Sequence, residues 1–201
     1  MFKSARLLVL LPILNCNPTV PKTITQDNIK NVKIVNAFCN ARQSFDAAEM
    51  EKYIADTFCL ISEDGIKKSY DRTAAYQISD WEKEMHTEWR YEILGADRNV
   101  VTVLLKEYND YYSLMGLGSG IQLLKYYLQN GKISQSVSKL FITESGTQTE
   151  AYHEFTKWLF HQPGLSEPGL VNTDGSLSFT GKSAPRMYYW LSKWNHLQRK
   201  E

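Results

Sequence analysis

Apolar residues in the first part of the chain recur every three or four positions, which is the spacing of amphipathic helices. Between residues 26 and 44 they share one side of a helix, for which Thr25 or Asp27 would be the N-cap. Asp46 and Glu49 have the spacing of a capping box and predict a second, short helix. Two helices are therefore expected before any strand.

A hairpin and a third helix are predicted next. The stretch "TFCLISEDGIKKS" reads as two short strands around a turn at Asp64-Gly65. In "YDRTAAYQISDWEKEM" the residues Tyr70, Ala74 and Trp81 lie close to one helical face.

After Met85, apolar residues occur at every second position, as expected for half-buried strands. A turn is predicted at "ADRN", and Asn130-Gly131 is the strongest hairpin signal in the chain. Short turns favour an antiparallel meander. The predicted strands cover residues 89–93, 100–115, 121–129 and 133–145.

The last part of the chain returns to a helical pattern. "TEAYHEFTKWLFHQ" and "SAPRMYYWLSKWNHL" both read as amphipathic helices, and Pro185 suits the first turn of the second. We interpret residues 146–201 as a helical C-terminal extension. Its aromatic faces are expected to pack on the chain's own sheet; a dimer contact, a lid or a partner helix groove are the alternatives.

The N-terminal segment resembles an export signal. "MFKSAR" is basic and "LLVLLPIL" is apolar but too short to cross a bilayer. Cys16 follows after Asn15, as in bacterial lipoprotein signals, and would be lipidated there. Ile13 and Asn15 depart from the usual lipobox and resemble the looser boxes of spirochaete lipoproteins. We expect a signal peptide over residues 1–15 and a tether over 16–28. An ordinary signal peptide with an incidental thiol and a buried N-terminal strand are the alternatives.

Composition limits the function classes. With 201 residues, of which 43% are apolar, the chain fits one main domain. It has 23 basic and 22 acidic residues and no basic cluster, which argues against nucleic-acid binding. Cys39 and Cys59 lie in apolar surroundings and are expected to be buried thiols, with a disulfide as the alternative. Neither the cysteines nor the four histidines have metal-ligand spacing, and "GLGSG" precedes a strand rather than a phosphate-binding helix.

The order of these elements resembles the nuclear-transport-factor-2-like (NTF2-like) superfamily, which includes SnoaL-like polyketide cyclases. The stretches "IVNAFCNARQSFDAAEMEKYIADTFCLIS" and "YYLQNGKI" carry the resemblance. It implies an α+β domain over residues 29–145, with a cone-shaped, curved antiparallel sheet and three N-terminal helices on its concave side. The superfamily's isomerases and cyclases use an acidic base, but no particular acid here matches their motif.

One face of each strand would line such a cone. The run Val101, Val103, Leu105 predicts that odd positions of that strand face inward, together with Glu107. In an apolar cavity the pKa of Glu107 would rise toward the range of a general base, and a structural ion pair is the alternative. On the last strand Ile133, Gln135, Val137 and Lys139 would face inward unless a bulge intervenes. The candidate ligand-binding residues are Trp89, Tyr91, Asn109, Tyr111, Gln122 and Tyr126.

The leading hypothesis is an exported lipoprotein of the bacterial envelope, at the outer membrane or cell surface, held by lipid on Cys16. Its domain would be a non-catalytic module that binds a small apolar ligand or a partner, and a homodimer is an option. No cofactor, metal or nucleic acid is expected. An isomerase- or cyclase-type enzyme with Glu107 as base and a structural envelope protein are the alternatives.

Overall fold

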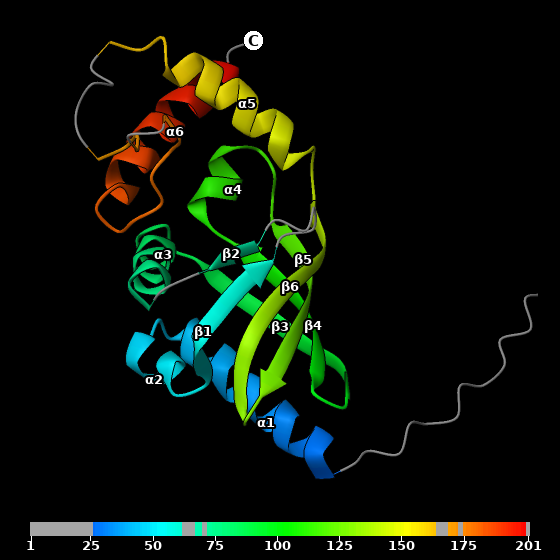
Figure 1. The fold of residues 1–201 in the computed structure, drawn as a ribbon. Helices are drawn as coiled ribbons and strands as arrows, with labels where there is room; N and C mark the ends of the chain where they lie inside the picture. Colours follow the sequence, from blue (N-terminus) through cyan, green and yellow to red (C-terminus); the bar gives the residue numbers. More distant parts are fainter. Residues whose placement is uncertain (1–25, 62–66, 70–71, 164–168, 173–174, 200–201) are drawn as a thin grey trace, which may run out of the picture.

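The fold is a mixed sheet with helices on one face and a helical layer at one end (Figure 1). This computed structural model describes residues 26–61, 67–69, 72–163, 169–172 and 175–199. The predicted signal peptide, Cys16, Thr25 and the Asp64-Gly65 turn lie outside the described residues. Among the described helices, none is both long and apolar enough to span a membrane.

Two helices precede the first strand and a third follows the second strand, as predicted. They are α1 (Gln26–Gln43), α2 (Ala47–Glu51) and α3 (Arg72–Glu84). The side chain of Asp46 accepts a hydrogen bond from the backbone N–H of Glu49 at 2.9 Å and so caps α2. On α1, Phe38 meets the ring of Tyr126 edge-on at 5.7 Å, which places α1 on the inner face of the sheet.

The cap at Asp46 gives a first prediction. Asp46→Ala removes the acceptor for the Glu49 N–H, and we expect the free energy of unfolding to fall by about 1 kcal/mol. Urea denaturation measures it, with Asp46→Asn, which keeps an acceptor oxygen, as the matched control. Equal losses in both variants would contradict a capping role.

Six strands form one sheet in the order β2-β1-β6-β5-β4-β3. Their bounds are β1 (Ile54–Ile61), β2 (Lys67–Ser69), β3 (Glu88–Asp97), β4 (Val100–Tyr108), β5 (Gly120–Gln129) and β6 (Lys132–Thr143). The β3–β6 meander is antiparallel, as predicted, and Asn130 and Gly131 both adopt positive φ, as a tight hairpin turn requires. However, β1 pairs in parallel with β6, so the sheet as a whole is mixed.

The predicted strand over residues 100–115 is too long. It ends at Tyr108, and the side chain of Asn109 accepts the backbone N–H of Tyr112 at 2.8 Å, which caps the short helix α4 (Asp110–Leu114). Because a side-chain cap stabilises the first helical turn, Asn109 ends the strand pattern. Tyr111 therefore belongs to a helix and not to the sheet.

The alternation of buried and exposed residues holds along β4 but fails on β6. Val101, Val103, Leu105 and Glu107 are all buried, as predicted. On β6 the pairing slips twice, between the partners of Leu123 and Leu124 and between those of Tyr127 and Leu128. These bulges turn Ser136 inward, while Gln135 is half-buried and Lys139 is exposed, so the inward assignment of the latter two was wrong.

Two apolar cores result. The first fills the sheet's inner face beneath α1. The second lies beyond the sheet, where α3 and α4 meet α5 (Gln148–Leu159) and α6 (Ala184–Gln198) (Figure 1). Both C-terminal helices were predicted, but α6 packs on α3 and α4 rather than on the sheet, and the aromatic residues of α5 pack on α6. The buried contributions of α5 and α6 are Phe155, Leu159, Met187, Leu191 and Trp194.

Cys39 and Cys59 are buried free thiols, which confirms the prediction and excludes the alternative disulfide between them. Burial raises the pKa of Cys39 to about 11, against the opposing effect of Arg42. The thiol therefore stays protonated and acts as a small apolar side chain.

Candidate functional site

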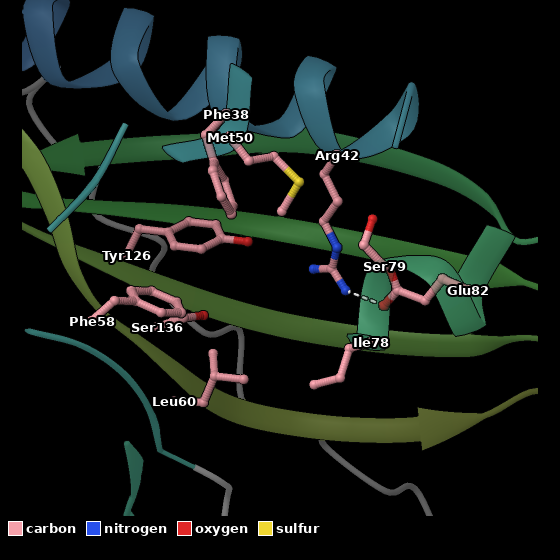
Figure 2. A pocket seen from close by; sticks show the side chains of 10 residues that line it. All are labelled: Phe38, Arg42, Met50, Phe58, Leu60, Ile78, Ser79, Glu82, Tyr126 and Ser136. Atoms are coloured by element: carbon pink, nitrogen blue, oxygen red, sulfur yellow. Dashed lines mark hydrogen bonds and ion pairs between the residues drawn. The ribbon is translucent and has the colours of Figure 1, made fainter. Parts of the chain in front are cut away.

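A cavity of about 80 Å³ lies between the sheet and the three N-terminal helices (Figure 2). Its wall is apolar over most of its area and polar at one end. The apolar lining residues are Phe38, Met50, Phe58, Leu60 and Ile78; the polar ones are Arg42, Ser79, Glu82, Tyr126 and Ser136. A few convergent polar groups in an apolar pocket are typical of small-molecule sites.

Arg42 organises the polar end. Its Nη2 donates to Glu82 Oε1 at 2.8 Å, and its guanidinium carbon lies 3.9 Å from the ring centre of Trp89. Burial disfavours the charged guanidinium, but the Glu82 carboxylate outweighs this and raises the pKa of Arg42. The side chain of Glu82 is 7% exposed and that of Arg42 is 24% exposed, so Arg42 is the more exposed side chain of the pair.

Tyr126 places a hydroxyl at the same end. It lines the cavity together with Arg42 and Ser136, and Figure 2 shows its hydroxyl pointing toward the guanidinium. Burial raises the pKa of Tyr126 above its ordinary value, although the charge of Arg42 opposes the shift. The phenol is therefore neutral at physiological pH.

Glu107 lies near this polar end but does not line the cavity. Its Oε1 accepts a hydrogen bond from Asn109 Nδ2 at 2.7 Å, and the Tyr112 hydroxyl is 3.5 Å from its Oε2. Burial and the negative charge of Glu82 raise the pKa of Glu107 to about 8, although Arg42 opposes the shift. Near neutral pH, Glu107 is thus mostly protonated.

Gly120 allows Tyr112 to reach Glu107. It pairs with Glu107 across β4 and β5, and a Cβ at this position would lie 2.9 Å from the Tyr112 ring. Real Cβ atoms essentially never come so close to another heavy atom. The absence of a side chain therefore lets the ring lie against the strand.

This contact predicts the effect of Gly120→Ala. The added methyl should displace the Tyr112 ring and destabilise the fold by about 1–3 kcal/mol. Thermal unfolding measures the loss, and the double variant Gly120→Ala/Tyr112→Leu should recover part of it because the smaller side chain makes room. No recovery would locate the strain elsewhere.

The other predicted site residues lie in different parts of the structure. Trp89 is buried beneath Arg42, and the half-buried Tyr91 donates its hydroxyl to Asn40 Oδ1 at 2.7 Å. Tyr111 packs against Trp81 in the second core, and Gln122 is half-buried on β5. Asn109 holds Glu107 and caps α4. Of the predicted set, Tyr126 alone appears among the ten residues that line the cavity.

Sequence reasoning missed Arg42 and Glu82. A usable signal existed for both, since each is a charged residue one helical turn from an apolar inward residue, Phe38 and Ile78 respectively. A charge on an apolar helix stripe is expected to have a buried partner. Within the described ranges, no group of three or more His, Cys, Asp or Glu side chains could hold a metal ion.

Solved structures with a similar arrangement include three informative examples. An NTF2-like protein of unknown function from Cytophaga hutchinsonii is 13% identical, with coverage of 55% of this chain and 88% of that chain and a TM-score of 0.43. A putative SnoaL-like polyketide cyclase from Jannaschia sp. CCS1 is 14% identical, with coverage of 60% and 89% and a TM-score of 0.45. An LEH-like epoxide hydrolase of M. tuberculosis is also 14% identical, with coverage of 57% and 80% and a TM-score of 0.45.

Proteins described as NTF2-like and SnoaL-like are among these similar structures. No protein-family model and no curated protein matches the sequence.

Proposed function

We propose that this protein is an exported lipoprotein whose domain binds a small, largely apolar ligand in the cavity beneath α1. The observation that carries the proposal is the combination of an apolar wall with a single polar end. Arg42 and Tyr126 are donors there, and the charge of Arg42 is balanced by Glu82. A neutral ligand with one acceptor oxygen would satisfy these donors without burying a new charge.

The size of the cavity limits the ligand. An apolar cavity of about 150 Å³ accommodates benzene, so about 80 Å³ suits a smaller group such as a short ketone. Larger molecules would insert only one end. The ligand class is therefore a short-chain carbonyl or ether compound, or a longer molecule that carries such an end group.

Binding can be tested with butanone and its hydrocarbon counterpart 2-methyl-1-butene, followed by NMR chemical-shift titration. We expect butanone to bind more tightly than the hydrocarbon and to lose that advantage in Tyr126→Phe. Ser136→Leu should fill the cavity and abolish binding of both probes, whereas Gln135→Leu, on the neighbouring position, should not. Failure of both probes to bind, or equal binding after Ser136→Leu, would exclude the cavity as the site.

The lipid anchor is supported by the sequence around Cys16, which lies outside the described residues. Diacylation of this cysteine would attach the domain to the envelope with two acyl chains, since one alone binds only marginally. Mass spectrometry of the N-terminus from a native membrane fraction should find acyl mass on Cys16. A Cys16→Ser variant that still sediments with membranes would contradict the anchor.

A second candidate is acid–base catalysis, favoured by the buried carboxyl of Glu107 with its raised pKa. An isomerase- or cyclase-type enzyme would move a proton next to a carbonyl. The direct assay is hydrogen–deuterium exchange of butanone α-protons in D₂O. Exchange above the buffer rate that disappears in Glu107→Gln would support catalysis; exchange at the buffer rate would leave ligand binding as the function.

A further inference from the structure

Helix α6 carries apolar side chains on two sides. One side is buried in the second core and holds Met187, Leu191 and Trp194. The other side exposes Tyr189 at 51% and Leu197 at 47%. A surface helix of a folded domain normally turns polar residues to solvent. The exposed apolar side of α6 is therefore not explained by folding and indicates an interaction surface.

The exposed side is aromatic and continues onto α5. The centre of the Trp190 ring lies 5.2 Å from that of Tyr189 and 6.0 Å from that of Trp158 on α5. Lys193 Nζ lies over two of these rings, 4.5 Å from the centre of Tyr189 and 4.9 Å from that of Trp190. Leu197 follows Lys193 by one helical turn and so lies on the same side. We call Trp158, Tyr189, Trp190, Lys193 and Leu197 the aromatic stripe.

The charge on α6 has one sign. Between residues 184 and 198 the helix contains no aspartate or glutamate. On the neighbouring α5, the exposed Lys157 and Glu154 lie beside Trp158 and balance each other. The net charge of the whole chain is only +1, so the positive charge is a local feature of this helix. The basic residues of α6 and its C-cap are Arg186, Lys193, His196 and Arg199.

We infer that the aromatic stripe binds the surface of an anionic membrane. Tyrosine and tryptophan prefer the headgroup level of a bilayer, because their apolar rings and polar tips are both satisfied there. The stem of Lys193 lies along two rings, and its ammonium can extend from them to lipid phosphates.

The composition of the stripe favours a membrane over an acidic protein. Exposed aromatic residues combined with basic ones are typical of helices that lie in the plane of a bilayer surface. Helices α5 and α6 form one end of the molecule, away from the start of α1 (Figure 1). The contact needs neither acyl chains on Cys16 nor a ligand in the cavity, so it can be tested independently of both.

Tryptophan fluorescence in the presence of brominated phospholipid tests the inference, because bromine quenches only rings that enter the bilayer. The sample is the full chain with Cys16→Ser, so that no acyl chain contributes. Its vesicles contain phosphatidylcholine and phosphatidylglycerol in equal parts. All five tryptophans follow residue 80, so quenching reports the folded domain and not the N-terminal segment. Three of them are buried, which leaves the half-buried Trp158 and Trp190 as the accessible rings.

We expect quenching on these vesicles and little quenching on phosphatidylcholine alone. Trp190→Phe should remove most of the signal. Lys193→Gln should raise the lipid concentration for half-maximal quenching about fivefold, the contribution of one basic residue near an anionic surface. Lys33→Gln is the matched control, since it makes the same change of charge at an exposed position of α1 and should have no effect.

A second pair of variants tests the apolar contact. Leu197→Ser should also weaken binding about fivefold, because the exposed half of this side chain would be buried against lipid. Leu94→Ser, at a leucine that is 51% exposed on β3, should have no effect. No quenching, equal quenching on phosphatidylcholine alone, or equal effects within either pair of variants would overturn the inference. Absence of quenching together with a fluorescence change on soluble polyglutamate would instead assign the stripe to an acidic protein.

Discussion

Replacing Glu107 by glutamine should remove much of the pH dependence of this protein's stability. The carboxyl of Glu107 has a pKa of about 8 in the fold and about 4.5 when unfolded. Between these values the unfolded chain releases a proton that the folded chain keeps, so rising pH favours unfolding. From about pH 5 to about pH 8 the stability of the parent relative to Glu107→Gln should fall by about 3 kcal/mol.

Urea denaturation at several pH values measures this difference. The sign of the change with pH is part of the prediction. As pH rises, the free energy of unfolding of Glu107→Gln increases relative to that of the parent. The reason is that the amide has the shape of a protonated carboxyl and stays neutral. Glu88→Gln, at an exposed position of β3, is the control and should leave the slope unchanged. Parallel curves for parent and Glu107→Gln would mean that Glu107 titrates normally.

The second large effect is expected at Arg42. Arg42→Met removes the cation that lies beside two buried carboxyl groups, Glu82 and Glu107. Removal of one partner from a buried ion pair typically costs about 3–5 kcal/mol, because the remaining charge has lost its counterion. We expect a loss of this size at neutral pH, measured by chemical denaturation.

The companion variant separates charge from packing. Arg42→Met/Glu82→Gln leaves no unpaired charge at this point and should recover most of the lost stability. Glu82→Gln alone should be less damaging than Arg42→Met, since the side chain of Arg42 is the more exposed of the two and its charge is the easier one to solvate. If the double variant were as unstable as Arg42→Met, the stem of Arg42 against Trp89 would be the important contact.

Local sequence patterns predicted every described helix except α4, the hairpins and the inner face of β4, because each depends on residues close together in the chain. The cap at Asn109 was harder to predict, since its position also continued the strand alternation. The bulges on β6 depend on pairing with β5 and leave no clear trace in the sequence of β6 alone.

For a related reason, the sequence could not predict that the residues at the polar end of the cavity lie together. Arg42, Glu82 and Tyr126 come from α1, α3 and β5, and the fold alone brings them together. Glu107 was found because it continues an apolar alternation on one strand, whereas its partners lie on separate elements. The alternation of apolar and polar residues shows which residues of a strand share one face. Which residues of other elements contact that face depends on the tertiary structure.

The packing of α6 against α3 and α4, and of α5 against α6, has a practical consequence. Glu82 lies on α3 and Tyr112 lies on α4, so the C-terminal helices support two groups of the buried polar network. A shortened recombinant version that stops after the sheet would expose the apolar surface of α3 and α4. Ligand screens and titrations done on such a fragment would report on a different molecule.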